Sequence, residues 1–208
     1  LSTDAGFSGS GNISLGTAST SATLQLRAAA NLNVATTPVV LGTAGGTIDV
    51  TNAATIVTFT NTSPFSGDGT LEKTGAGTLR LAAVNTMTGP INVTAGRLDV
   101  SGSTTSSSNI TLSTGTTLGG AGTINGTVSL APGSFLSPGN AAGTLTLANG
   151  ADLSNGVTYQ WQLTGDVAGT PAFDALNVSG GSLTLGGTSQ LTLDFSGITG
   201  GNDPNSAS

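Results

Sequence analysis

We predict that this chain folds as an all-β solenoid, a single-stranded parallel β-helix of about ten coils. Three observations lead to this prediction. Apolar and polar residues alternate in very short segments, turn-forming Gly, Asn and Ser residues separate these segments, and similar segments recur about every twenty residues. No segment places apolar residues at positions i, i+3, i+4 and i+7, so we expect no amphipathic helix.

The alternating segments consist of an apolar residue, a small or polar residue and a second apolar residue. Such alternation puts the apolar side chains on one face of a strand. The segments include Leu24-Gln-Leu26, Leu32-Asn-Val34, Ile48-Asp-Val50, Ile91-Asn-Val93, Leu98-Asp-Val100, Ile110-Thr-Leu112, Leu183-Thr-Leu185 and Leu191-Thr-Leu193. We expect a set of these side chains to point inward and stack: Leu71, Leu79, Leu81, Ile91, Val93, Leu98, Val100, Ile110 and Leu112.

The spacing between similar segments indicates a solenoid, because self-similarity at a fixed period of about twenty residues is typical of stacked repeats. The pairs with this spacing are Leu71 and Ile91, Leu79 and Leu98, Ile91 and Ile110, Leu98 and Leu118, and Ile124 and Leu145. Two or three short strands with their turns fill such a period. A β-sandwich or barrel is the main alternative, but its strands usually run to five residues or more.

We expect one domain over residues 1–200, in which 1–64 form irregular coils, 65–147 form regular repeats and 148–200 carry longer strands. The segment Val157–Leu163 is an example of the longer alternation. Residues 201–208 are expected to be a linker or the start of a further segment.

The composition favours a narrow, repeated core. Charged residues make up 7% of the 208 residues, against roughly 25% in ordinary globular proteins. Apolar residues reach 36% and the mean hydropathy is +0.20, values that do not fit disorder. Aromatic residues are only 4%, so the core is expected to consist of small and branched side chains.

The composition also excludes several functions. A net charge of −6 with four scattered basic residues argues against nucleic-acid binding, which needs clustered cations. No apolar run approaches the ~18 residues of a membrane span. The chain has no Cys and no His, so thiolate metal sites and Ser-His-Asp or Cys-His catalysis are impossible within it. We predict no catalytic, cofactor or metal site.

One long segment resembles a known repeat. Residues 65–100 read FSGDGTLEKTGAGTLRL and, after a short connection, NTMTGPINVTAGRLDV. This pattern resembles the autotransporter-associated β-strand repeat, with Met87 where an aromatic residue is usual and Pro90 where Gly or Thr is usual. Residues 136–147 resemble the segment that follows such repeats. The resemblance implies a right-handed β-helix in a bacterial protein that is secreted or held at the cell surface, and it implies no particular activity.

Enzymatic function is the alternative, because parallel β-helices host polysaccharide lyases and glycoside hydrolases. Such sites need two or three carboxylates close together in a groove. The ten acidic residues are scattered in the sequence, and we expect them to be isolated, outward-facing charges. Whether any two carboxylates lie together in a groove discriminates a scaffold from a carbohydrate-active enzyme.

The densest aromatic group lies near the C-terminus and consists of Tyr159, Trp161, Phe173 and Phe195. We predict that these residues cover the end of the core or form a contact surface. The predicted partners are further copies or segments of the same protein, meeting end to end, or a surface glycan. The predicted function is a structural scaffold: a passenger, stalk, adhesin-like or fibre segment.

Overall fold

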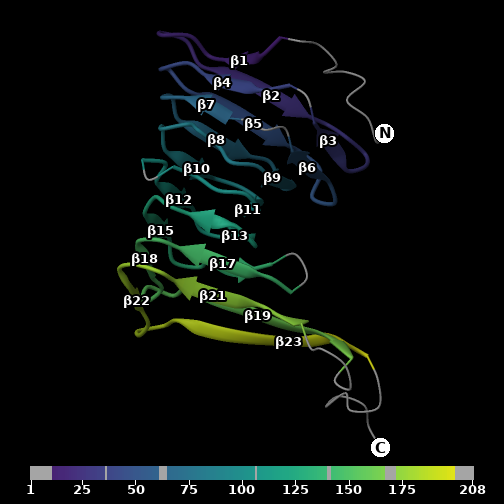
Figure 1. Ribbon diagram of the computed structural model, residues 1–208, viewed down its shortest axis with the longest axis vertical. Helices are drawn as coiled ribbons and strands as arrows, with labels where there is room; N and C mark the ends of the chain where they lie inside the picture. The colour runs from purple at the N-terminus through teal and green to yellow at the C-terminus, as the bar shows by residue number, and fades with distance from the viewer. Residues whose placement is uncertain are drawn as a thin grey trace, which may run out of the picture.

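The computed structural model describes residues 11–35, 37–60, 65–105, 107–139, 142–166 and 172–199. Every regular element in these residues is a β-strand, and the strands stack along the long axis of the molecule (Figure 1). Nearly all strand pairs are parallel, so the predicted parallel β-helix is confirmed. The predicted linker, residues 201–208, lies outside the described residues.

The strands form three faces of the stack, of which the second and third are continuous sheets. The second face is an eight-stranded sheet of β2 (Ala22–Leu26), β5 (Gly46–Val50), β8 (Leu71–Thr74), β10 (Ile91–Val93), β12 (Ile110–Leu112), β15 (Val128–Leu130), β18 (Gly150–Asp152) and β22 (Ser182–Thr184). The third is a sheet of β3 (Leu32–Val34), β6 (Ile56–Phe59), β9 (Thr78–Leu81), β11 (Arg97–Val100), β13 (Thr117–Gly120), β16 (Phe135–Pro138) and β19 (Thr158–Asp166), joined by the antiparallel β20 (Ala172–Phe173) and the parallel β23 (Gln190–Thr199).

The first face is interrupted in the middle of the stack. Its first part is β1 (Ile13–Leu15), β4 (Val39–Leu41) and β7 (Phe65–Gly67), and its second part is β14 (Thr123–Ile124), β17 (Thr144–Leu147) and β21 (Ala175–Val178). Isolated bridges from Val84 to Ser103 and from Ser103 to Thr123 connect the parts, and the Thr86 N–H donates to the Phe65 carbonyl at 2.9 Å. Each coil therefore contributes three short segments to the stack.

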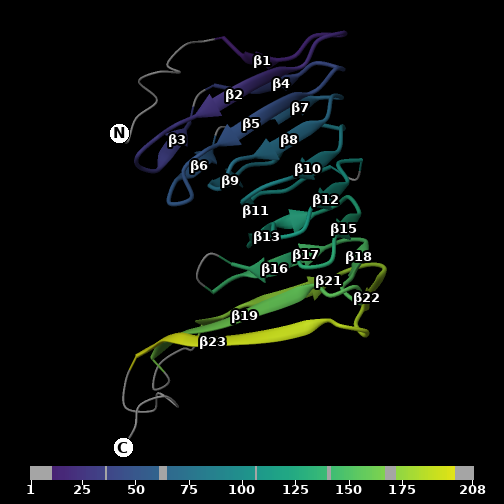
Figure 2. The ribbon, with the colours of Figure 1, turned by 180° about the vertical axis from the view of Figure 1, so that it is seen from behind.

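The described residues form eight coils, because each coil adds one strand to the eight-stranded sheet. The expectation of about ten was too high, since the coils are not all near twenty residues long. Leu24 pairs with Ile48 at one end of the stack and Tyr159 with Leu191 at the other, so the first and last coils are longer. Figure 2 shows β19 and β23 extending beyond the shorter strands.

Four of the five predicted stacking pairs are confirmed by the register of the sheets. Leu71 lies beside Ile91, Leu79 beside Leu98, Ile91 beside Ile110, and Leu98 beside Leu118. The fifth prediction was wrong by two residues: Ile124 pairs with Leu147, and Leu145 pairs with Leu176. Both leucines of Leu145-Thr-Leu147 are apolar and inward, so the alternation alone does not distinguish between them.

The core is one continuous column inside the three faces. All nine side chains predicted to point inward are buried, none more than 1% exposed. Phe59 and Phe65 add an edge-to-face aromatic contact with ring centres 4.9 Å apart. Because each inward side chain packs on its equivalents in the coils before and after it, the rows form a shared core that no coil could make alone.

Lys73 is the exception among the inward positions. It lies in register between Ile48 and Val93, and it is 0% exposed. Its ammonium group donates hydrogen bonds to the backbone carbonyls of Thr74, Gly75 and Ala95, at 2.6, 2.8 and 3.1 Å. The lysine thus satisfies carbonyls of two successive turns from the inside, a role that the alternation pattern does not reveal.

The first prediction concerns the stacked core. Leu98→Asp should lower the free energy of unfolding by several kcal/mol, because it places an unpaired carboxylate between Leu79 and Leu118. Thr111→Asp is the matched control, since Thr111 is exposed on the outer side of β12. Urea denaturation of both variants checks this. An equal effect of the two substitutions would contradict the inward register.

The second prediction concerns pH. Burial lowers the pKa of Lys73 to about 8 from its ordinary 10.5, with the charge of Asp49 opposing the shift. Between these values the unfolded chain binds more protons than the folded protein, so the free energy of unfolding should rise with pH. The rise between pH 8 and 10 should be about 2 kcal/mol. No imidazole or thiol group titrates in this range, because the chain has no His or Cys.

Denaturation at a series of pH values measures this rise, with Lys73→Met as the control that should lack it. The burial-raised pKa of the single tyrosine, Tyr159, makes the opposite contribution only above about pH 10. A free energy of unfolding that is flat, or that falls from pH 8 to 10 in the unsubstituted protein, would contradict the assignment.

Candidate functional site

A charged network lies on the outer side of the third face. Asp99 accepts from Arg80 Nη2 at 3.2 Å and from Arg97 Nε at 2.5 Å, and the Asp99 side chain is 0% exposed. The expectation that the acidic residues are isolated, outward solvating charges was wrong here. The reason is tertiary: the stacking brings Arg80 beside Asp99 in the sheet, and the two arginines cover the carboxylate.

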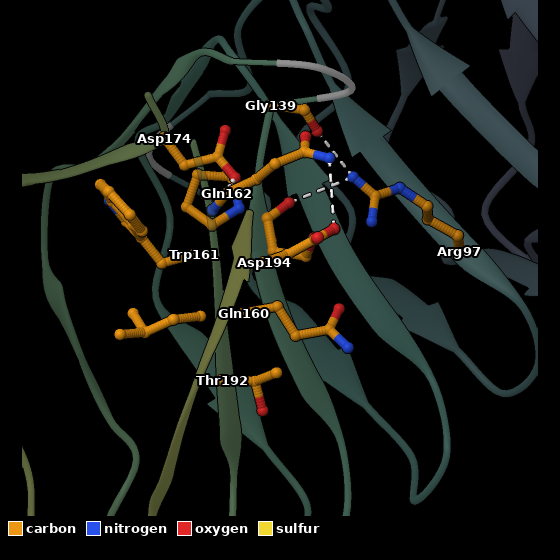
Figure 3. A pocket seen from close by; sticks show the side chains of 11 residues that line it. Arg97, Gly139, Gln160, Trp161, Gln162, Asp174, Thr192 and Asp194 are labelled. Atoms are coloured by element: carbon orange, nitrogen blue, oxygen red, sulfur yellow. Dashed lines mark hydrogen bonds between the residues drawn. The ribbon is translucent and has the colours of Figure 1, made fainter. Parts of the chain in front are cut away.

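The Arg97 side chain reaches across two further coils because Gly119 leaves room for it. A Cβ at Gly119 would lie 2.1 Å from Arg97 Nη2 and 2.3 Å from the Ser137 carbonyl. Through this gap Arg97 Nη2 donates to the carbonyls of Ser137 and Gly139 at 3.1 and 2.7 Å (Figure 3). The arginine thereby fixes the end of β16, where a pocket begins.

This polar pocket is a cavity of about 480 Å³ over the end of β16 and the long strands β19 and β23. Its lining includes Arg97, Gly139, Gln160, Trp161, Gln162, Asp174, Thr192 and Asp194. β19 and β23 run side by side, in register as far as the pair Gln162 and Asp194 and shifted beyond it, which brings residues about thirty positions apart in the sequence to one place. The extension of these strands beyond the other strands creates the pocket.

Two carboxylates meet in the pocket through Gln162. The Gln162 backbone N–H donates to Asp174 Oδ2 at 3.0 Å, and its Nε2 donates to Asp194 Oδ2 at 3.4 Å (Figure 3). The sequence contains no signal for this arrangement, since the two acids lie on different segments. Asp174 and Asp194 thus share the lining of one pocket, which is part of what the enzymatic alternative requires.

The two carboxylates differ in their protonation chemistry. Burial raises the pKa of Asp174, and the nearby charge of Asp194 adds to the shift, while neighbouring backbone N–H groups and Arg97 oppose it. Hydrogen bonds from Ser196 lower the pKa of Asp194. Asp174 Oδ1 is buried and makes no hydrogen bond among the described residues. The pocket thus holds two carboxyl groups whose pKa values are shifted in opposite directions.

Three of the four predicted aromatic residues form a cluster. Trp161 lies 6.4 Å from Phe173 in a stacked arrangement and 6.3 Å from Phe195 in an edge-on arrangement, measured between ring centres. Alternation along β19 puts Trp161 on the opposite face from Gln160 and Gln162, and Figure 3 shows it on the far side of the strand from Arg97. Tyr159 lies apart from the cluster, packed against the end of the core.

The core is open at its C-terminal end. Four inward-facing leucines of the last coil are exposed: Leu183 by 37%, Leu185 by 64%, Leu191 by 61% and Leu193 by 50%. Leu183, Leu185 and Leu191 line, with Tyr159, a second, mainly apolar cavity of about 490 Å³. The predicted aromatic cap therefore does not close this end within the described residues. The alternation marks these leucines as inward but does not tell which coil is last.

Other kinds of site find little support in the described part of the chain. There is no group of three or more acidic side chains that could hold a metal ion. No helix long and apolar enough to cross a membrane occurs there either.

Part of the chain matches a family of known proteins. Residues 71–100 match the family model of the passenger-associated-transport-repeat. The matched residues run from β8 to β11. This range contains Lys73 and all three residues of the Arg80–Asp99–Arg97 network. A comparison with curated proteins finds none that matches. The chain is thus an all-strand parallel β-helix that carries, in residues 71–100, a repeat of the type found in autotransporter passengers.

Proposed function

We propose that this chain is a structural scaffold segment of a bacterial protein that is secreted or held at the cell surface, and that it acts through shape and association without catalysis. The observation that supports this most is the unbroken core. One row of paired positions runs through all eight coils: Leu32, Val57, Leu79, Leu98, Leu118, Leu136, Tyr159 and Leu191.

The basic residues support the same proposal because they serve the scaffold. Lys73 is bonded to turn carbonyls, and Arg80 and Arg97 are paired with Asp99. An acidic polysaccharide needs exposed cations to bind it, and these three cations already have partners inside the molecule. The transport-repeat match adds the expectation of export.

The third prediction tests this proposal. The purified protein should release no product from polygalacturonate or alginate, measured as reducing ends and as ultraviolet absorbance of unsaturated sugars. Asp174→Asn is the matched variant, because Asp174 is the carboxyl group of the pocket with the raised pKa. Turnover by the unsubstituted protein that disappears in Asp174→Asn would overturn the proposal and favour a carbohydrate-active enzyme.

A second candidate function is binding of an uncharged glycan in the polar pocket. Carboxylates and side-chain amides accept and donate hydrogen bonds to sugar hydroxyl groups. Gln160, Thr192 and Asp194 line one side of the pocket, and Gln160 and Thr192 are direct neighbours across β19 and β23. The glycan would rest on the outer side of the sheet, over Gln160 and Thr192.

The fourth prediction tests this candidate by calorimetry against a panel of neutral oligosaccharides. A sugar that binds in the pocket should lose at least about tenfold in affinity with Asp194→Asn, since one charge-assisted hydrogen bond contributes about 1.5–3 kcal/mol. Asp152→Asn is the control, because Asp152 is another exposed acid whose pKa a serine hydrogen bond lowers, but it lies outside the pocket. Equal losses in both variants, or no binding at all, would exclude the candidate.

A further inference from the structure

Asparagine is followed directly by glycine at three places in the chain: Asn125-Gly126, Asn149-Gly150 and Asn155-Gly156. Such a pair can modify itself without an enzyme, because the backbone nitrogen of the glycine can attack the amide carbon of the asparagine side chain and close a ring. Glycine favours this reaction, since it has no side chain in the way and its backbone rotates freely. The hydrogen bonds that hold each asparagine in the fold then decide which pair reacts.

Two of the three asparagines are held by the stack. Asn125 Nδ2 donates to the Thr104 carbonyl at 2.7 Å, and the Asn125 backbone N–H donates to Thr104 Oγ1 at 3.2 Å. Asn149 Nδ2 donates to the Asn125 carbonyl at 2.7 Å. The two amides thus form a column of hydrogen bonds from coil to coil. Each amide has to break its bond before its carbon can reach the following nitrogen.

Asn155 has no such bond. It is exposed in the turn between β18 and β19, and neither its side chain nor the Gly156 N–H makes a hydrogen bond to a described residue. In the two preceding coils, the equivalent N–H groups have acceptors. Gly115 donates to the Gly133 carbonyl at 3.0 Å, and Gly133 donates to the Gly156 carbonyl at 2.8 Å. The Gly156 nitrogen is therefore the one in this column that is available to react.

The same position in the two preceding coils holds residues that cannot react. Thr114 precedes Gly115, and Pro132 precedes Gly133. The three glycines share one backbone conformation, with φ of +78° at Gly115, +75° at Gly133 and +78° at Gly156. A threonine should therefore fit in the place of Asn155 without disturbing the turn.

We propose that Asn155 is a site of spontaneous covalent modification. The Gly156 nitrogen bonds to Asn155 Cγ, the bond from Cγ to Nδ2 breaks, and Nδ2 leaves as ammonia with the proton that the Gly156 nitrogen gives up. Water then opens the resulting succinimide ring at either of its two carbonyl carbons, which yields aspartate or isoaspartate. Water is the only other reactant, and the reaction does not depend on the proposed scaffold role.

Both products change the turn that leads into β19. Each adds a negative charge close in sequence to Asp152, whose Oδ1 accepts from the Ser154 N–H at 2.9 Å. Isoaspartate also inserts an additional carbon atom into the backbone directly before Gly156. The next residue, Val157, is 0% exposed. Modification should therefore weaken the packing of Val157 and the start of β19, which lines the polar pocket.

Incubation of the whole chain in heavy-oxygen water at mildly alkaline pH, followed by mass spectrometry of its peptides, tests the proposal. The rate of oxygen uptake at each asparagine in the folded protein is divided by the rate at the same asparagine in the urea-unfolded chain, which removes the effect of local sequence. This ratio should be at least about fivefold higher for Asn155 than for Asn125 or Asn149, the factor that corresponds to one hydrogen bond of about 1 kcal/mol. Equal ratios, or a lower ratio for Asn155, would overturn the proposal.

Asn155→Thr is the matched variant for a second measurement, because Thr114 occupies the equivalent place two coils earlier. During the same incubation, the urea midpoint of the unsubstituted protein should fall with the fraction of isoaspartate, whereas the midpoint of Asn155→Thr should stay constant. An equal fall in both proteins would place the damaging modification elsewhere in the chain and overturn the proposal.

Discussion

The structure depends on one interaction: the parallel stacking of each short strand on its equivalent one coil away. Strands of three to five residues cannot bury an apolar face by themselves, and an isolated coil has no core. Stacking solves both problems together, since it pairs the backbone groups and covers the inward side chains from above and below. The same dependence explains why inward side chains are buried in the middle coils but exposed in the last coil.

Polar groups inside and on the stack are organised by the same constraint. Turns at successive coils lie above one another, so their carbonyls form columns that need donors. Lys73 supplies donors to two turns from the interior, and Arg97 supplies donors to the carbonyls of Ser137 and Gly139 from the outside. A protein with only 7% charged residues thus uses three of its four cations to hold coils together.

The polar pocket and the open end both arise where the regular coil changes. β19 and β23 contain 9 and 10 residues, so their outer halves project past the strands of the preceding coils. The projecting part carries Gln162 and Asp194 on one face and Trp161 and Phe195 on the other. Features that distinguish this chain from a plain rod are therefore concentrated in its last two coils.

The sequence by itself determined the fold class and the inward residues of the regular coils. Apolar and polar residues that alternate with a period of two do not fit a helix, and a repeat near twenty residues requires stacking. Leu79, Leu98 and Leu118 could therefore be placed without coordinates.

Only the tertiary structure decided which residues meet across coils of unequal length. The pairing of Ile124 with Leu147 and the meeting of Asp174 with Asp194 depend on the lengths of turns, which alternation does not encode. Exposure of Leu191 was likewise decided by position, because a leucine is buried in a solenoid only when another coil follows it.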